Sequence, residues 1–481
     1  MEKLNTGTIT ELKELLRKDE ITTSDIVEDI QKAIDTDANY DLSLNAYISF
    51  DISLIRTALE ESGAERGTFR DTVLGGMPIA VKDLINVRGG PTTCGSNILR
   101  EYCSPYDATA VAYMKKNGGI PAGKLNMDEF AMGSSNENTA FGIVRNPHDR
   151  KRIPGGSSGG AASAVAADLA VAALASDTGG SIRQPASMCG VFGLKPTYGR
   201  VSRYGLVAYA SSLDQIGPIT KNVTDAALLL EAISGHDARD STSAREKVPD
   251  FSEAVGKSVR GMKVGIPDEY FGEGLDDEVR RIVDEGIDIL QKSGAVAKKI
   301  NLRHTRYAIA TYYIIATAEA SSNLARFDGI RYGTRFAPSD DLIQFYRENR
   351  SRGFGREVKR RILLGTFTLS SGYYDAYYLK AQKARTLIQK DFTDVFEEVD
   401  LIATPVSPVP AWEIGEMMDD PLQMYLSDIY TVPVNLAGVP AASVPCGKTS
   451  GGLPVGLQLI APQFREDLLL TAARAVEKGR G

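Results

Sequence analysis

The residues best suited to chemistry are one lysine in an apolar segment and two serines in glycine-rich segments. In SDTGGSIRQPAS, residues 176–187, Gly179 and Gly180 lead directly into Ser181. Adjacent glycines allow consecutive backbone N–H groups to converge on one point, as the stabilisation of an oxyanion requires. Ser181 is therefore a candidate nucleophile. The GGS tripeptide alone is weak evidence, because turns rich in glycine and serine are common.

Lys82 lies in the apolar segment PIAVKDLI, residues 78–85. Alternation along a strand places Lys82 on the same side as Ala80 and Leu84. Burial there disfavours the ammonium and lowers the pKa towards that of a neutral amine, which is the form that accepts a proton. Taken alone, however, the segment fits better with an edge strand whose lysine faces water.

Ser157 lies in the third segment, PGGSSGG, residues 154–160. Its tandem glycines permit backbone conformations closed to other residues, so the loop could hold Ser157 close to a reacting group. A serine hydroxyl is a poor nucleophile until a base removes its proton. This logic predicts that Ser181 attacks, that Ser157 relays the proton, and that Lys82 is the base and later the acid.

Two other motifs fit the same glycine-rich segment less well. Residues 155–160 match the G-x-x-x-x-G part of a phosphate-binding loop, but Ala161-Ala162 follow where Lys-Ser/Thr is required. Residues 155–159 match the G-x-S-x-G nucleophile elbow, which needs a buried strand before it. The preceding RNPHDRKRIP is polar and broken by proline, and the base would be His236 or His304, which we expect to face solvent. A His-based triad is the weaker interpretation.

The elements that must position these residues alternate between strand and helix. The first helix has Thr8 or Thr10 as its N-cap, and Ser24 is the expected cap of the second. A run of small apolar residues over 159–175 has helical length and the composition of a buried helix. This alternation predicts an α/β fold with a mixed sheet. The expected strands are 44–50, 78–87, 262–267, 295–301, 400–408 and 453–461, and the other expected helices are two over 8–35, 275–294, 305–328 and 373–399.

The composition is that of a globular protein with an acidic balance. The chain has 481 residues, a hydrophobic content of 43% and a net charge of −7. A length of about 150 residues per domain would allow about three domains, although large α/β enzymes often share one core. The acidic charge argues against direct binding of nucleic acid through phosphate contacts. If the chain works near a nucleic acid, we expect a partner to supply those contacts.

The sequence shows no signal for export and no cysteine pattern typical of a zinc site or a disulfide framework. It contains no apolar run long enough for a signal peptide or a membrane span, so we expect a soluble cytoplasmic protein. It has four cysteines and no CxxC motif, which argues against a zinc site or a disulfide framework. We expect free thiols at Cys94, Cys103, Cys189 and Cys446.

The sequence resembles the amidase signature family in three elements, which are Lys82, GGSSGG and DTGGSIR. Ser157 follows Lys82 by 75 positions, and Ser181 follows Ser157 by 24 positions. The resemblance runs over nearly the whole chain. It implies a single large α/β domain over 1–481, a twisted mixed sheet surrounded by helices, with the N-terminal helices of about 8–35 packed on it. It also implies a Ser-Ser-Lys triad of Lys82, Ser157 and Ser181. The implied oxyanion donors are the backbone N–H groups of Thr178, Gly179, Gly180 and Ser181.

Several stretches resemble the branch of this family that supplies ammonia to tRNA-dependent amidotransferases, among them KLNMDEFAMGSSNE (124–137) and YTVPVNLAGVPAASVPCG (430–447). In that branch glutamine is the ammonia donor. The resemblance implies that Arg361 and Asp428 hold its carboxylate and ammonium, with Tyr312 as a further contact. By its sequence context alone, Arg361 would be a solvated charge on a helix. His148 is a small departure, because a large aromatic residue is expected there.

The resemblance also implies partners. The expected assembly is a heterotrimer with B and C subunits, in which the B subunit makes the main contact with Glu-tRNA(Gln) and converts it to Gln-tRNA(Gln). The complex uses ATP and Mg²⁺ through that partner, and no cofactor or metal is expected in this chain. One alternative is a free-standing amidase of the same family acting on another small amide. A non-catalytic scaffold is a further alternative, but it would not need the GGS turn.

Overall fold

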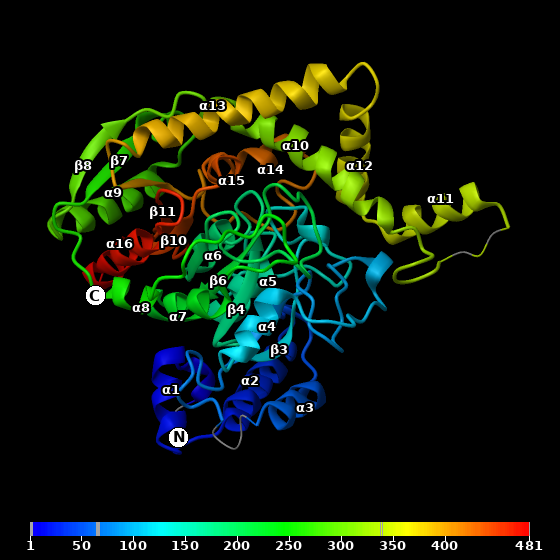
Figure 1. Ribbon diagram of the computed structural model, residues 1–481, viewed down its shortest axis with the longest axis horizontal. Coiled ribbons are helices and arrows are strands. Elements are labelled where there is room, and N and C mark those ends of the chain that lie inside the picture. The colour runs from blue at the N-terminus through cyan, green and yellow to red at the C-terminus, as the bar shows by residue number, and fades with distance from the viewer. Residues whose placement is uncertain (1–2, 64–67, 337, 339, 481) are drawn as a thin grey trace.

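A mixed sheet of eleven strands runs through the described part of this computed structural model, which covers residues 3–63, 68–336, 338 and 340–480 (Figure 1). The strands follow one another across the sheet in the order β1 (Tyr47–Ser49), β3 (Ile120–Leu125), β2 (Pro78–Lys82), β4 (Ala172–Asp177), β6 (Gln215–Thr220), β5 (Phe192–Lys195), β10 (Ala441–Lys448), β11 (Pro454–Ile460), β9 (Leu401–Pro405), β7 (Lys263–Pro267) and β8 (Val296–Ile300).

Helices surround this sheet. In Figure 1, α1–α3 gather at the bottom of the molecule, α13 runs along the top, and α11 projects from the body beside α12. The α-helices in the described residues are α1 (Ile9–Arg17), α2 (Thr23–Ala38), α3 (Ile52–Ser62), α4 (Thr109–Lys116), α5 (Gly159–Ala166), α6 (Arg183–Cys189), α7 (Val223–Ile233), α8 (Phe251–Val255), α9 (Asp277–Lys292), α10 (Ala308–Asn323), α11 (Leu342–Gly353), α12 (Arg356–Thr368), α13 (Lys380–Val395), α14 (Pro421–Leu426), α15 (Val432–Ala437) and α16 (Glu466–Gly479).

Short helical segments of other types join these elements. The segment η8 (Tyr374–Leu379) is a π-helix directly before α13. The 3₁₀ turns are η1 (Leu4–Thr6), η3 (Asn97–Leu99), η4 (Glu129–Ala131), η5 (Asp268–Tyr270), η6 (Thr305–Tyr307) and η7 (Leu324–Arg326). None of the described helices is both long and apolar enough to cross a lipid bilayer.

One hydrophobic core joins the two ends of the chain. Its largest cluster of buried side chains includes Ile9 and Ile26 from the N-terminal helices and Val476 from α16. The N-terminal helices therefore pack on the same core as the C-terminal helix. The family fold expected from the sequence, a twisted mixed sheet surrounded by helices, is confirmed.

The strands that carry the predicted chemistry lie side by side in the interior of the sheet. β2 is parallel to both of its neighbours, β3 and β4. Every residue of β2 and β4 is buried, as is typical of strands covered on both faces. Because parallel strands end at the same edge, the carboxyl ends of β2 and β4 bring Lys82 close to the segment that begins after Asp177. This arrangement excludes an edge-strand lysine that faces water.

Several expected boundaries are wrong. The run over 159–175 is not one helix: α5 ends at Ala166, and residues 172–177 are the buried strand β4. Small apolar residues suit a buried helix and a buried strand equally, so periodicity could not separate them. The expected strand over 78–87 ends at Lys82, where the N–H of Ile85 donates to the carbonyl of Lys82 at 3.0 Å and turns the chain.

The first two helices have N-caps of the expected residue type, but the cap of the second helix lies two positions earlier than expected. Thr8 caps α1 in a capping box with Glu11. The cap of α2 is Thr22 rather than Ser24, because the Thr22 side chain accepts the N–H of Asp25 while the Asp25 carboxylate accepts the N–H of Thr22. Besides β4, the interior strands β3, β5, β6 and β10 were not expected from the sequence.

Candidate active site

Lys82 ends β2 with its side chain fully buried among serine hydroxyl groups. Its Nζ lies 2.8 Å from Ser157 Oγ, 2.8 Å from Ser158 Oγ and 3.0 Å from Ser176 Oγ. Ser157 and Ser158 come from the glycine-rich loop before α5, and Ser176 comes from β4. The structure thus brings two of the three predicted triad residues into direct contact.

The pKa of Lys82 is strongly lowered. Burial disfavours the ammonium and lowers the pKa from 10.5 to about 7, although the carboxylates of Asp128, Asp177 and Asp214 act in the opposite direction. At neutral pH a large fraction of the molecules therefore carries Lys82 as the neutral amine. This form has a lone pair that accepts a proton.

The hydroxyl groups around Lys82 are not equivalent. The Ser158 hydroxyl donates its hydrogen to the carbonyl of Ser176 at 2.9 Å, so its oxygen can only accept from Lys82. The hydroxyl hydrogens of Ser157 and Ser176 remain available to the lysine lone pair. Of these two residues, Ser157 belongs to the loop that contacts the predicted nucleophile segment, where the N–H of Ser158 donates to the carbonyl of Ser181 at 3.2 Å.

The loop that carries Ser157 requires its glycines for close approach. A β-carbon at Gly156 would lie 2.1 Å from Asp128 Oδ2, and Gly155 has a φ of +81°. The peptide bond between Gly156 and Ser157 is cis. The loop is fixed on both sides, since the N–H of Gly156 donates to Gln184 Oε1 at 2.9 Å and the N–H of Asp128 donates to the carbonyl of Ser157 at 3.2 Å.

Asp177 organises the turn that carries Ser181. Its carboxylate accepts the N–H groups of Gly180 at 2.9 Å and Ile182 at 3.1 Å, and it pairs with the fully buried guanidinium of Arg183. Burial alone would raise the pKa of Asp177, but the charge and hydrogen bonds of Arg183 lower it to about 2. The turn is therefore built around a permanent carboxylate–guanidinium pair.

The predicted oxyanion donors divide into two groups. The N–H of Gly180 donates to Asp177 Oδ1 at 2.9 Å and is therefore already engaged. Within residues 3–63, 68–336, 338 and 340–480, the N–H groups of Thr178, Gly179 and Ser181 make no hydrogen bond. Ser181 is 7% exposed, whereas Lys82 and Ser157 are completely buried, so Ser181 is the member of the predicted triad that a substrate reaches most directly.

Arg361 is buried on the inner side of α12. Its Nε donates to Glu357 Oε1 at 2.8 Å and its Nη1 donates to the Tyr209 hydroxyl at 2.8 Å. The rings of Tyr209, Tyr313 and Tyr425 surround the guanidinium at 5.7, 5.2 and 5.4 Å. Arg361 is therefore not the solvated charge that its basic context suggested. Its Nη2 has no partner in the described residues and is free to bind an anion.

Asp428 presents an uncompensated carboxylate oxygen. Its Oδ2 accepts the hydroxyl of Ser134, while Oδ1 is buried without a hydrogen-bond partner among the described residues. Burial raises its pKa to about 7, and Arg361 is close enough to counteract this in part. A buried carboxylate oxygen without a donor suits a cationic ligand.

Thr431 connects Asp428 to the Ser181 turn. Its hydroxyl oxygen lies 2.7 Å from the carbonyl of Gly179 and 3.1 Å from the carbonyl of Asp428. Tyr312 contacts the other side of the same turn, because a β-carbon at Gly179 would lie 2.7 Å from its hydroxyl oxygen. The structure thus gathers Arg361, Asp428 and Tyr312 around the segment that carries Ser181.

Sequence reasoning missed several residues of this site. Ser134, Ser158, Ser176, Tyr209 and Glu357 all contact a predicted residue directly. Only Glu357 left a usable signal, because it precedes Arg361 by four residues on a helix and therefore faces the same side. The others are brought in by tertiary contacts between segments far apart in the sequence.

The histidines take no part in this arrangement. His148 Nε2 lies 2.9 Å from the carbonyl of Cys189, and His236 is exposed. His304 was expected to face solvent, but it is half-buried, with Nδ1 2.7 Å from Asp391 Oδ1.

All four cysteines are free, with Cys103 exposed and the others buried. In the described chain, no group of three or more His, Cys, Asp or Glu side chains could hold a metal ion.

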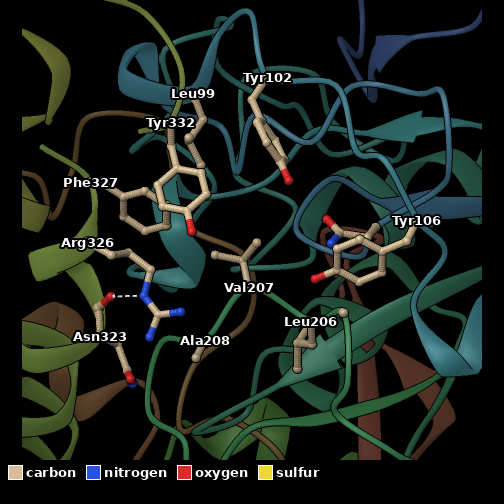
Figure 2. A pocket seen from close by; sticks show the side chains of 12 residues that line it. Leu99, Tyr102, Tyr106, Leu206, Val207, Ala208, Asn323, Arg326, Phe327 and Tyr332 are labelled. Carbon is tan, nitrogen blue, oxygen red and sulfur yellow. Dashed lines mark hydrogen bonds between the residues drawn. The ribbon is translucent and has the colours of Figure 1, made fainter. Parts of the chain in front are cut away.

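A separate cavity of about 150 Å³ is lined by Leu206, Val207 and Ala208, which lead into Tyr209. Figure 2 shows Tyr102, Tyr106 and Tyr332 around Val207, with Arg326 donating to the backbone carbonyl of Asn323. None of the predicted site residues lines this cavity.

Comparison with known proteins agrees with this geometry. The family model described as Amidase matches residues 26–470. The chain is 54% identical over 476 residues to the A subunit of the glutamyl-tRNA(Gln) amidotransferase of Koribacter versatilis, covering 98% of both chains. It is 56% identical over 478 residues to the protein of the same name from Thermodesulfovibrio yellowstonii, covering 99% of this chain and 98% of that one.

A solved structure shows the same fold. The crystal structure of the A subunit of the glutamyl-tRNA(Gln) amidotransferase of Thermotoga maritima matches with a TM-score of 0.81 at 44% identity, covering 99% of this chain and 96% of that one. Both the family model and these relatives span nearly all of the sequence. The chain therefore belongs to the amidase family.

Proposed function

We propose that this chain is the glutamine-hydrolysing component of a glutamyl-tRNA(Gln) amidotransferase and that it works through a Ser-Ser-Lys triad. The names of the full-length relatives at 54–56% identity support the first part. The observation that carries the second part is the fully buried Lys82, with its pKa lowered to about 7 and its Nζ 2.8 Å from Ser157 Oγ.

Acylation begins with a neutral Lys82. Its lone pair takes the hydroxyl proton of Ser157, and Ser157 Oγ takes the proton of Ser181 as Ser181 Oγ bonds to the side-chain amide carbon of glutamine. The negative charge that develops on the amide oxygen is stabilised by the free N–H groups of Thr178, Gly179 and Ser181. Gly180 is left out of this set of donors, because Asp177 holds its N–H.

The intermediate collapses when the proton returns. Lys82, now an ammonium, passes its proton through Ser157 to the leaving nitrogen; the C–N bond breaks and ammonia departs. A water molecule, deprotonated by the same relay, then attacks the ester on Ser181 and releases glutamate. Each proton taken by Lys82 is returned within the cycle, so the enzyme is regenerated without a redox step.

Arg361 and Asp428 hold the amino-acid end of glutamine in this proposal. The free Nη2 of Arg361 binds the carboxylate, and the unpartnered Oδ1 of Asp428 binds the ammonium. Tyr312, packed on Gly179, is the further contact to glutamine beside the Ser181 turn.

The released ammonia passes to a B subunit, with a C subunit completing a heterotrimer. The B subunit uses ATP and Mg²⁺ to activate the glutamate of Glu-tRNA(Gln) and makes the main contact with the tRNA. This division suits a chain with a net charge of −7. Because aminoacyl-tRNA is the final acceptor, we place the assembly in the cytoplasm.

The proposal is tested with the chain purified together with the B and C subunits of the same organism. Glutaminase activity that is lost in Ser181→Ala supports it. Hydrolysis of simple amides without activity on glutamine, unchanged by Arg361→Ala, indicates a free-standing amidase instead. If the native chain copurifies with neither of these partners, the role in transamidation is wrong.

A further inference from the structure

A group of large apolar side chains is exposed on the outer side of α12 and the segment after it. Leu363, Leu364 and Phe367 lie on one face of α12 by their helical spacing and are 71%, 46% and 48% exposed. Tyr373 and Tyr377 continue this group, with ring centroids 4.3 and 6.2 Å from that of Phe367. We call these five residues the α12–η8 face.

The backbone at this face has a conformation that needs an explanation. η8 is a π-helix with no buried residue, although its sequence YDAYYL is rich in aromatic side chains. π-helices are rare and occur often at functional sites. A short element that leaves its aromatic rings in solvent contributes little to the core of this chain, so its packing partner is expected outside the chain.

One hollow adjoins the face. Tyr374 and Tyr378 from η8 line a hollow of about 300 Å³ together with Glu319 and Asn323 of α10. Asn323 also lines the cavity of Figure 2, which contains Tyr102 and Tyr332. The segment that carries the face therefore also lines one concave, tyrosine-containing site of the kind that receives anchor side chains in protein interfaces.

The charge around the face restricts what can cover it. Residues 356–390 contain eight Lys or Arg and two Asp or Glu side chains, but Arg361 and Arg385 are turned into the body of the chain. The exposed lysines of this stretch are Lys359, Lys380, Lys383 and Lys390. Lys380 and Lys383 are exposed and form no ion pair within the described chain. A second copy of this chain, docked face to face, would place these basic residues against each other. An occupant with acidic residues around an apolar patch fits better.

The apolar side chains distinguish a protein occupant from a nucleic acid. Nucleic-acid binding depends on phosphate contacts by basic residues and on stacking by aromatic rings. Neither requires two adjacent leucines as exposed as Leu363 and Leu364. An apolar patch with a polar rim is instead typical of a protein–protein interface.

We infer that the α12–η8 face is the docking surface for the ammonia-accepting partner, which covers it with an apolar patch bordered by acidic residues. This inference rests on the proposed function. The face lies on the outer side of the helix whose inner side carries Arg361. A partner bound here therefore contacts the same helix that holds the proposed carboxylate-binding residue.

The test measures binding of the chain to a purified complex of the B and C subunits. The double variant Leu363→Asp, Phe367→Asp is compared with Val296→Asp, which changes a residue of similar exposure (55%) on the edge strand β8. Loss of two central apolar contacts is expected to weaken binding by about 100-fold or more. Val296→Asp should bind like the wild type, and glutamine hydrolysis by the isolated double variant should match that of the isolated wild-type chain.

A charge variant keeps the test decisive if the double variant does not fold. Lys380→Glu, Lys383→Glu should weaken binding by about tenfold at low salt, with a smaller effect at high salt. Unchanged binding of both variants overturns the inference. So does weakened self-association of the isolated chain, or weakened tRNA binding, when the affinity for the B and C subunits is retained. If the wild-type chain binds neither the B nor the C subunit, the proposed function is wrong as well. Failure of the docking surface alone is therefore distinguishable from failure of the proposed function.

Discussion

Lys82 and Ser157 are 75 positions apart in the sequence, and folding places Nζ of one 2.8 Å from Oγ of the other. Both side chains are fully buried. A lysine in this position is destabilising as an ammonium and becomes a base when neutral. In the proposed mechanism this contact couples the burial of one strand end to the activation of Ser157.

The first prediction concerns pH. Because the pKa of Lys82 is lowered to about 7, the rate of acylation by glutamine should rise about tenfold per pH unit well below pH 7 and level off above it. Single-turnover kinetics between pH 5.5 and 9 measure this rate. Lys82→Met, which keeps the side-chain volume, should fold but form no acyl-enzyme; a rate in that variant comparable to the wild type would show that another group is the base.

Asp128 should set the midpoint of that profile. Burial raises its pKa to about 7, and its carboxylate favours the charged form of Lys82. In Asp128→Asn the rise in acylation rate should therefore shift to lower pH, because the lysine loses a proton more readily. Asp128 also accepts the N–H groups of Asn136 and Asn138, so the variant tests two roles. A lower rate with an unmoved midpoint would indicate a purely structural role.

Arg361 should control the affinity for glutamine more than the chemical step. Arg361→Ala removes a charged hydrogen-bond donor for the substrate carboxylate, and KM for glutamine should rise by about 10–150-fold. Lys359→Ala, on the exposed side of the same helix, is the matched control and should leave KM unchanged. Steady-state kinetics separate the two effects. If kcat falls and KM stays constant in Arg361→Ala, the assignment to substrate binding is wrong.

Asp428 should make that affinity depend on pH. Burial raises its pKa to about 7, so it is increasingly protonated as the pH falls below 7 and loses its attraction for the substrate ammonium. KM for glutamine should therefore increase as the pH falls from 8 to 5.5. Asp428→Asn should have a high KM with little pH dependence. A wild-type KM that is constant over this range would contradict the assignment.

The fold class could be predicted from the sequence because the strands and helices that could be recognised alternate along the chain. The helix α9, with acidic residues in its first turn and Gly294 after its end, lies within two residues of the expected limits. The failures lie in the interior. Residues 159–177 form a helix and then a strand, and both are buried on all sides, so their composition carries no period that separates them.

The site could be predicted where a motif carries it and not where tertiary contacts do. The two GGS segments made Ser157 and Ser181 candidates, and the family resemblance gave them their expected roles. Lys82 and Arg361 each looked like a solvated charge in their local contexts, and only long-range packing buries them. Ser134, which donates to Asp428 across 294 positions, had no local signal at all.

The central claim is that glutamine acylates Ser181 with Lys82 as the base. It is tested most directly by quenching the complex of the chain with its B and C subunits during turnover and locating the covalent glutamyl group by peptide mass spectrometry. We expect an ester on Ser181 in the wild type and none in Lys82→Met. An adduct on Ser157, or turnover without any covalent intermediate after rapid quenching, would contradict it.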